Sequence, residues 1–311
     1  MIISASRRTD LPAAHAGWLV ERFREGYVLV RNPMNARRVS RVSLRPKDVD
    51  GVVFWTKNPE PLLGRLDAFR DYAYYFQFTL TGYDRDVEPN LPSHERRLET
   101  FLRLSEMIGP ERVLWRYDPI LLNGKYTPDW HLETFRRYAE RLRGATRRAT
   151  ISFVDTYPRN KKRLEALHSA EIAEETMRTM AWEISAVARL NGMQAVSCAE
   201  ETELIDCGVG HASCVDAELL SRISGKVLQA GKDPNQRDAC GCAPSVDIGA
   251  YNTCPNGCLY CYANYSPAFL KNNLAKADVH SPMLCDAPEA ADTVTDRKSK
   301  PLEGVQLKME F

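Results

Sequence analysis

Short runs of β-branched and aromatic residues alternate with longer stretches of helical periodicity through the first two thirds of the chain. This alternation is typical of parallel βαβ units, because consecutive parallel strands need a long crossover, usually a helix, between them. Six strands are predicted, at Ile2–Ser6, Val52–Trp55, Tyr74–Leu80, Arg112–Tyr117, Thr150–Val154 and Gln194–Cys198. The clearest amphipathic helices are predicted at Leu11–Arg24, Pro92–Met107 and Ala170–Leu190. An inserted hairpin is predicted at Tyr27–Val30 and Val39–Leu44.

The expected fold class is α/β, with the six strand–helix pairs forming a partial (β/α)6 barrel of the TIM type. We expect residues 1–200 to form this barrel, residues 201–270 to form a cysteine-rich cluster-binding region on the barrel mouth, and residues 271–311 to form a C-terminal tail. Asp292–Lys300 is polar and charged, so the tail is expected to be loosely ordered or to lie over the surface.

The 311 residues carry a net charge of +1, with 44% apolar and 27% charged side chains. A nearly neutral protein lacks the strong overall field expected of a dedicated nucleic-acid or membrane-surface binder. No apolar run approaches the roughly 18 residues that span a bilayer. The segment after Arg7-Arg8 lacks the hydrophobic region of a secretory or twin-arginine signal. These features predict a cytoplasmic protein with no membrane partner.

The nine cysteines are distributed unevenly: none occurs in the first 197 residues, and eight lie between Cys198 and Cys261. In a reducing compartment such clustering indicates metal binding more often than disulfide bonding. Cys254, Cys258 and Cys261 have the spacing CxxxCxxC, with Tyr260 immediately before the third cysteine. A [4Fe–4S] cube usually takes one thiolate per iron, so three thiolates leave one iron open to chelate a small molecule.

The segment around these cysteines, residues 252–264, resembles the cluster loop of the radical S-adenosylmethionine superfamily, and we call it the cluster loop. Its three cysteines match the metal ligands of that superfamily, and Tyr260 matches the aromatic residue that lies against the adenine. The segment Gly257–Tyr262 is similar to spore photoproduct lyase in particular. The whole chain resembles a family named domain of unknown function 1848, through Ser6–Asp10, Arg116–Pro119 and Cys240-Gly-Cys242 followed by the cluster loop.

The resemblance implies a radical S-adenosylmethionine enzyme, which generates a 5′-deoxyadenosyl radical that abstracts hydrogen from its substrate. The implied cofactors are a [4Fe–4S] cluster and S-adenosylmethionine, and the implied electron donor is flavodoxin or ferredoxin. The substrate class expected is an anionic small molecule or modified nucleotide. The resemblance does not identify a particular substrate.

Two features depart from the superfamily pattern. The cluster loop normally follows the first strand, whereas here it lies near the C-terminus. Either the barrel is permuted, or Val246–Tyr251 supplies a short strand that closes against the first one. The Gly-Gly-Glu motif that usually binds the methionyl amino group is missing, and Thr56-Lys57-Asn58 stands in its place.

Four further cysteines could hold a second [4Fe–4S] cluster with every iron ligated by protein: Cys198, Cys214, Cys240 and Cys242. Cys207 and His211 are alternative ligands for this site. In the competing interpretation, Cys198 is a buried small hydrophobic residue and Cys214 lies at a helix entry.

Six charged residues follow or end the predicted strands: Arg7, Arg8, Asp10, Lys57, Arg116 and Asp118. Chemistry in parallel barrels gathers at the carboxyl ends of the strands, so these residues form the predicted catalytic group. The cations favour an anion, either the carboxylate of S-adenosylmethionine or an acidic group on the substrate. Alternatively, Arg7 with Asp10 and Arg116 with Asp118 form ion pairs that only close the rim of the barrel.

Two other functions stay open. The first is nucleic-acid repair or modification, as in spore photoproduct lyase, which the basic stretches Arg136-Arg137, Arg147-Arg148 and Lys161–Arg163 favour. Charge runs are more often solvated faces, so nucleic acid is not the favoured partner. The second is a non-catalytic iron–sulfur or zinc protein, although zinc loops usually pair one CxxC with a second, distant pair.

Overall fold

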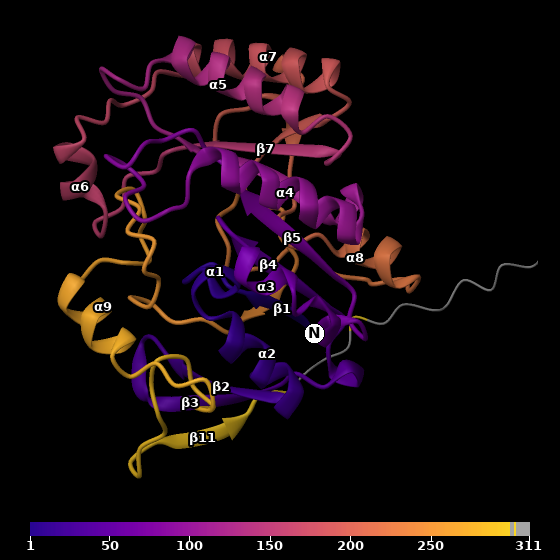
Figure 1. Cartoon of the computed structure of the whole chain (residues 1–311), viewed down its shortest axis with the longest axis vertical. Coiled ribbons are helices and arrows are strands. Elements are labelled where there is room, and N and C mark those ends of the chain that lie inside the picture. The colour runs from indigo at the N-terminus through magenta and orange to yellow at the C-terminus, as the bar shows by residue number, and fades with distance from the viewer. Residues whose placement is uncertain (299–301, 303–311) are drawn as a thin grey trace, which may run out of the picture.

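Eight strands form the main sheet of the computed structural model, which describes residues 1–298 and 302. The strands are β1 (Ile2–Ala5), β4 (Gly51–Thr56), β5 (Tyr74–Thr79), β6 (Val113–Ile120), β7 (Arg148–Phe153), β8 (Gln194–Ser197), β9 (Gly210–His211) and β10 (Ser245–Asp247). Their order is β10-β1-β4-β5-β6-β7-β8-β9, and every neighbouring pair is parallel (Figure 1). All six predicted strands are present, and the α/β class is confirmed.

The helices are α1 (Leu11–Ala14), α2 (Ala16–Glu25), α3 (Glu60–Leu63), α4 (His94–Ile108), α5 (Pro128–Arg141), α6 (Lys161–Ala166), α7 (Glu174–Leu190), α8 (Ala217–Ser224) and α9 (Pro267–Leu274). The prediction of one continuous helix over Leu11–Arg24 is wrong, because the helix is interrupted at His15, where φ is −133° and ψ is 31°. The buried His15 Nε2 lies 2.8 Å from the carbonyl oxygen of Thr253, so the residue at which the helix breaks contacts the cluster loop. None of the helices among the described residues is both long and apolar enough to cross a membrane.

The sheet does not close into a barrel. β9 and β10 are its edges, and in the described part of the chain they do not pair with each other. The edge strands are only two and three residues long, whereas closure requires matched strands with a regular stagger. β10 lies parallel to β1, with Val246 opposite Ile3. The short strand expected within Val246–Tyr251 beside the first strand is therefore present.

Alternate residues of the strands pack on opposite sides of the sheet. On one side, Phe54 and Phe76 pack beneath the crossover helices in the largest apolar cluster. On the other side, Val53 and Tyr75 pack with Leu220 of α8 and with buried cysteines. In Figure 1, α5 and α7 lie side by side beyond β7. Both faces of the sheet are thus covered, as is usual for a parallel sheet.

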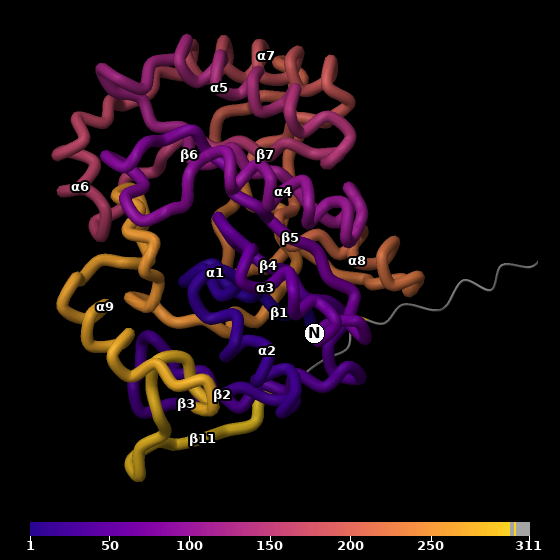
Figure 2. Tube along the Cα trace, viewed as in Figure 1, coloured from indigo at the N-terminus to yellow at the C-terminus, as the bar shows by residue number. Residues whose placement is uncertain are grey.

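A second, three-stranded sheet lies at one end of the molecule. Its strands are β2 (Tyr27–Asn32), β3 (Asn35–Ser43) and β11 (Thr293–Asp296). β2 and β3 form the predicted antiparallel hairpin, and β11 pairs parallel with β3. The C-terminal segment that carries α9 runs past this hairpin in Figure 2, and the Leu29 amide donates to the Pro282 carbonyl (2.9 Å). The tail therefore lies over the surface as far as β11, while residues 299–301 and 303–311 fall outside the described part.

The segment from residue 201 to residue 270 contributes both edges of the main sheet, β9 and β10. Its cysteine-rich part packs against the same face of the sheet as α8. The division of the chain into three parts at residues 200 and 270 stays a prediction.

Candidate functional site

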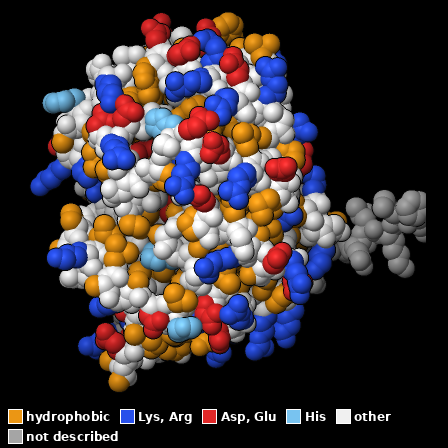
Figure 3. Space-filling view, in the orientation of Figure 1, with side chains coloured by type: hydrophobic (Ala, Val, Ile, Leu, Met, Phe, Trp, Pro, Cys, Tyr) orange, Lys and Arg blue, Asp and Glu red, His pale blue; other side chains and the backbone are white. Residues whose placement is uncertain are grey.

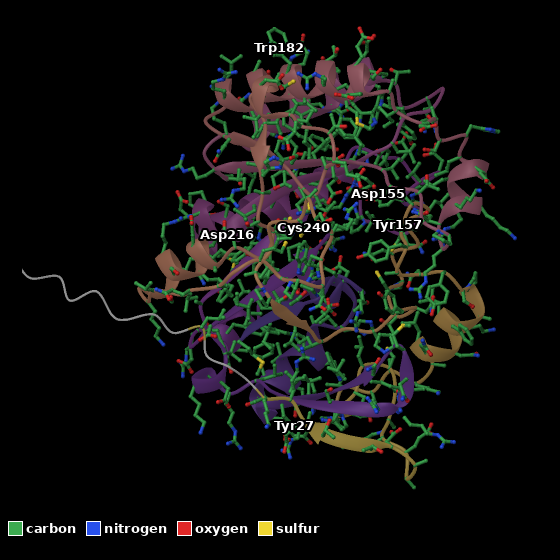
Figure 4. The ribbon with its side chains drawn as sticks, turned by 180° about the vertical axis from the view of Figure 1, so that it is seen from behind. Tyr27, Asp155, Tyr157, Trp182, Asp216 and Cys240 are labelled. Atoms are coloured by element: carbon green, nitrogen blue, oxygen red, sulfur yellow. The ribbon has the colours of Figure 1, made fainter. Side chains whose placement is uncertain are left out.

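A cavity of about 650 Å³ opens at the carboxyl ends of the parallel strands. All fourteen residues that the sequence predicts for the site line this cavity. They are Arg7, Arg8, Asp10, Lys57, Arg116, Asp118, Cys198, Cys214, Cys240, Cys242, Cys254, Cys258, Tyr260 and Cys261. In the rear view of Figure 4, Cys240 lies near the middle of the molecule, between Asp216 on one side and the lining residues Asp155 and Tyr157 on the other.

The alternation of the strands explains why these side chains meet. Lys57 lies four positions beyond Val53, so it belongs to the sheet face that α8 covers. Arg116 and Asp118 continue the same alternation beyond Leu114. At the carboxyl ends this face turns from apolar to polar, and the polar end is the cavity wall.

The cluster loop is fixed to the loop that follows β5. The Asn90 side-chain amide donates to the Pro255 carbonyl (2.8 Å), and the Leu259 amide donates to the Val87 carbonyl (3.0 Å). Gly257 has φ +73°, and a Cβ there would lie 2.9 Å from the Asn90 amide nitrogen. A residue with a side chain would therefore be strained at this position and would press on the contact that holds the loop.

A second anchor of the cluster loop comes from α6, which lies beside it in Figure 2. The Arg163 guanidinium donates to the carbonyl oxygens of three loop residues, Leu259, Cys261 and Asn264. The Asn160 side chain donates to the carbonyl of Tyr260 (2.9 Å). The cluster loop is thus held from both sides through its backbone, which leaves its cysteine side chains free of these contacts.

Tyr260 is part of a buried polar network. Its hydroxyl donates to Glu88, whose Oε1 also lies 2.8 Å from Lys57 Nζ and 2.9 Å from Thr81 Oγ1. Arg97 lies 3.5 Å from the other carboxylate oxygen, without hydrogen-bond geometry. Burial alone would raise the pKa of Glu88, but the Lys57 and Arg97 charges outweigh it, and the pKa lies below its usual value.

The three thiols of the cluster loop fit a cluster that takes three protein ligands. Cys254 and Cys258 are buried and Cys261 is half-buried, and all three face the same cavity. Burial, with the nearby Asp10 charge, raises the pKa of Cys254 to about 12. A positive metal centre is the kind of partner that stabilises such a thiolate. The Ala263 amide already donates to the Cys261 sulfur (3.3 Å).

A second group of thiols lies in the same cavity. The Cys198 and Cys214 sulfurs are 3.0 Å apart, and Cys214, Cys240 and Cys242 pack in one buried cluster with Cys198 beside it. The Cys242 contact lowers the pKa of Cys240 to about 6. In the described residues, no group of three or more His, Cys, Asp or Glu side chains is arranged to hold a single metal ion. A cube differs from such a site, because each thiolate binds a separate iron.

The charged residues at the strand ends divide into paired and unpaired groups. Arg116, which is buried, and Asp118, which is half-buried, form the ion pair of the alternative interpretation, and Asp118 also accepts from Ser152. Burial alone would raise the pKa of Asp118, but the Arg116 charge outweighs it and lowers the pKa. The Arg7–Asp10 pair of the alternative interpretation is absent from the described ion pairs. Arg7 Nη2 instead donates to Ser245 Oγ (3.1 Å), a neutral partner.

Asp10 is a structural anchor in this conformation. Its carboxylate caps α1 by accepting from the Ala13 amide (3.1 Å), and it also accepts from the Lys57 amide (2.7 Å) and the Asn256 side chain (3.1 Å). Burial raises the pKa of Asp10. These contacts join the end of β1, the end of β4 and the cluster loop.

Three residues that the sequence prediction missed complete the site: Glu88, Arg163 and Asp247. Asp247 ends β10 and accepts from the Arg7 amide (2.8 Å), and Arg8 lies 3.9 Å from it. A signal for Glu88 was present, because acidic residues follow the third predicted strand just beyond Gly82. Arg163 was assigned to a basic run, and nothing local in the sequence marks it as an anchor.

No curated protein matches the sequence of this chain. One family matches residues 2–263, which is most of the chain and includes the cluster loop through Ala263. The chain belongs to this family, described as "Domain of unknown function (DUF1848)".

Proposed function

We propose that this protein is a radical S-adenosylmethionine enzyme that acts on an anionic substrate. The observation that carries the proposal is the arrangement of the CxxxCxxC thiols. Cys254, Cys258 and Cys261 face one cavity at the carboxyl ends of a parallel sheet, together with the strand-end cations. Ligands of open α/β sheets bind outside the carboxyl ends of the strands, so the position supports a catalytic rather than a purely structural site.

A [4Fe–4S] cluster in the cluster loop would supply the electron that splits S-adenosylmethionine into methionine and a 5′-deoxyadenosyl radical, which takes a hydrogen atom from the substrate. The residues of the chain would position the cofactors and the substrate and shield them from water. Arg163 and Asn90 fix the loop backbone. Tyr157 and Tyr262, with ring centroids 5.6 Å apart, form an aromatic part of the cavity wall.

Arg7 supports the assignment of an anionic ligand. It takes part in none of the ion pairs among the described residues, and its guanidinium lies 5.6 Å from the Trp55 ring centroid. Arg116 lies 5.4 Å from the same ring, but its charge is already balanced by Asp118. Arg7 is therefore the cation of the cavity best able to bind a carboxylate or phosphate, through two parallel hydrogen bonds.

Several residues of the basic stretches that favoured a nucleic-acid enzyme pair with carboxylates of the protein itself. Arg136 pairs with Glu133, Arg147 with Glu111, and Arg148 with Asp216. On the face shown in Figure 3, Lys and Arg side chains are interspersed with Asp and Glu. A small anionic molecule fits these observations better than a nucleic-acid backbone does, because a phosphate chain requires a continuous basic track.

The test is anaerobic reconstitution with iron and sulfide, followed by reduction with dithionite in the presence of S-adenosylmethionine. We expect a [4Fe–4S] cluster and the products 5′-deoxyadenosine and methionine. Replacing Cys254, Cys258 and Cys261 together by alanine should abolish both products, whereas Cys285→Ala, outside the cavity, should not. A cluster without cleavage would assign the protein to the non-catalytic iron–sulfur class. Cleavage by the triple variant would contradict the proposal.

A further inference from the structure

We propose that Cys198, Cys214, Cys240 and Cys242 together bind a second iron–sulfur cluster, separate from the cluster loop. These residues do not take part in the proposed cleavage of S-adenosylmethionine, so the proposal goes beyond that function. The four cysteines come from three places: the end of β8, the segment after β9, and the segment before β10. All four line the cavity.

The four thiols lie in one cluster of side chains. Cys198 and Cys214 touch at 3.0 Å, and Cys214, Cys240 and Cys242 are buried in the same cluster, against which Cys198 packs. Three of the four are buried and Cys198 is half-buried. Packing alone gives no reason for four sulfurs to gather from three segments at one polar cavity wall, because buried cysteines ordinarily pack as isolated small apolar residues.

The spacing of the thiols is that of free groups rather than of a disulfide. The sulfur separation of 3.0 Å between Cys198 and Cys214 exceeds a disulfide bond of about 2.05 Å. It is also shorter than the ~3.8 Å that separates two sulfurs bound to one tetrahedral zinc at 2.3 Å. Because each thiolate of a cube binds a separate iron, binding a cube requires these two thiols to move apart by considerably more than ~1 Å.

Hydrogen-bond donors already point at the sulfurs. Arg116 Nη1 lies 2.9 Å from the Cys214 sulfur, and the Val215 amide lies 3.4 Å from the Cys242 sulfur. A cation and a backbone amide directed at sulfur are the contacts that stabilise metal-bound thiolates from outside the ligand shell. Arg116 therefore joins the second thiol group to Asp118 at the end of β6.

The structure separates the four cysteines from the two alternative ligands. Cys207 packs in the main apolar core, with its thiol 3.6 Å from the Asp206 carboxylate. His211 Nε2 lies 3.1 Å from Glu203. Neither residue lines the cavity. Cys207→Ala is consequently a matched control, because it removes a buried thiol of the same region without touching the proposed site.

Four protein thiolates ligate every iron of a cube, so the second cluster has no open position for S-adenosylmethionine. It also spans the gap between the sheet edges. Cys214 lies three residues after β9, Cys242 lies three residues before β10, and the Ala243 amide donates to the Val215 carbonyl (2.9 Å). A cluster here would tie together the two edges that no strand pairing joins.

The experiment measures iron and acid-labile sulfide in the anaerobically reconstituted full-length chain. We expect about eight irons in the unaltered protein and in Cys207→Ala. The variant lacking Cys254, Cys258 and Cys261 should keep about four irons, and its reduced electron paramagnetic resonance spectrum should not change with S-adenosylmethionine. Replacing Cys240 and Cys242 by alanine should also leave about four irons.

The outcomes distinguish this proposal from the proposed function. About four irons in the unaltered protein and none in the triple variant would overturn the second cluster and leave the first intact. About four irons in both proteins would support the second cluster and contradict the first. Zinc in place of iron in the triple variant would overturn the iron–sulfur assignment of the second site. Since the triple variant keeps all four cysteines, the test does not depend on the folding of the Cys240 and Cys242 variant.

Discussion

The hydroxyl of Tyr260 in the cluster loop donates a hydrogen bond to Glu88, a carboxylate 172 residues earlier in the chain. Glu88 is completely buried and is the only acidic partner of Lys57 among the described ion pairs. This contact connects the charge balance at the end of the sheet to the position of the cluster loop. The residue expected to lie against adenine is therefore also a structural tether.

Replacing Glu88 by glutamine should destabilise the protein strongly. Glutamine keeps an oxygen that accepts from Tyr260 and Thr81, but it leaves the buried Lys57 and Arg97 without a counter-charge. Loss of one partner of a buried pair typically costs about 3–5 kcal/mol. Urea unfolding measures the change. Glu60→Gln, which breaks a more exposed pair with Arg96, is the control and should cost less than ~1 kcal/mol. Equal effects of the two substitutions would contradict this account.

Gly249→Ala should disturb the junction between β10 and β1. An added Cβ would lie 2.7 Å from Ser6 Cβ and 3.0 Å from Thr9 Cγ2, both in a tightly packed region. Overpacking of this kind costs about 1–3 kcal/mol. Gly124→Ala meets no atom within 4 Å and should change the unfolding free energy by less than ~0.5 kcal/mol. Thermal unfolding of the two variants side by side checks the difference.

The stability of the protein should fall in acid partly because of His131. Its Nε2 lies 2.9 Å from the Leu121 carbonyl and its Nδ1 lies 2.8 Å from the Tyr117 hydroxyl, an arrangement that suits the neutral ring. Burial lowers the pKa of His131 from 6.5 to about 4. Between these values the unfolded chain binds a proton that the folded protein does not, so stability decreases as pH falls from 6.5 to 4.

The loss assigned to His131 is about 3 kcal/mol over that range. His131→Gln should remove this part of the pH dependence, as measured by urea unfolding at pH 7.5 and pH 4.5. His280→Gln alters an exposed ring and should retain the pH dependence of the unaltered protein. An unchanged slope in the His131 variant would show that other groups carry the acid sensitivity.

Arg7 and Arg116 should respond differently to substitution. Arg7→Leu breaks no carboxylate pair, so folding should be retained while binding of S-adenosylmethionine or another carboxylate weakens by at least tenfold, about 1.4 kcal/mol. Arg116→Leu leaves the half-buried Asp118 without its cationic partner and should cost about 1–3 kcal/mol of stability. Anaerobic calorimetric titration and urea unfolding separate the two effects. Arg24→Gln, an exposed position away from the cavity, is the control for both.

The six central strands could be predicted because each is a compact apolar run that is buried on both faces. β9 could not, since a two-residue edge strand has no periodicity of its own and forms only where β8 presents an unpaired edge. The break at His15 escaped prediction for a similar reason. The local pattern favours one helix, and the contact with Thr253, 238 residues away, decides otherwise.

The site residues on or directly after strands could be predicted because the carboxyl ends of parallel strands all lie at the cavity. Glu88 lies in the loop after β5 and Arg163 lies in the short helix α6. Their positions depend on hydrogen bonds to the cluster loop, in the case of Glu88 to Tyr260 within it. The alternative pairing of Arg7 with Asp10 does not form, because Asp247 enters from β10 and accepts from the Arg7 amide, while Asp10 caps α1. Long-range partners of this kind leave no local mark in a single sequence.

The pairing of β10 with β1 constrains the order in which the sheet can assemble during synthesis. Ser245 lies opposite Ile2, so the second strand of the pair is synthesised only after all the residues between β1 and β10 have been made. The seven other strands of the sheet, β9 included, are already available when the residues that lead into the cluster loop emerge. A chain that stops before residue 245 contains these seven strands but none of the cluster-loop thiols. If the proposed cluster forms at that loop, it can therefore load only after these seven strands have been synthesised, and products truncated before residue 245 cannot carry it.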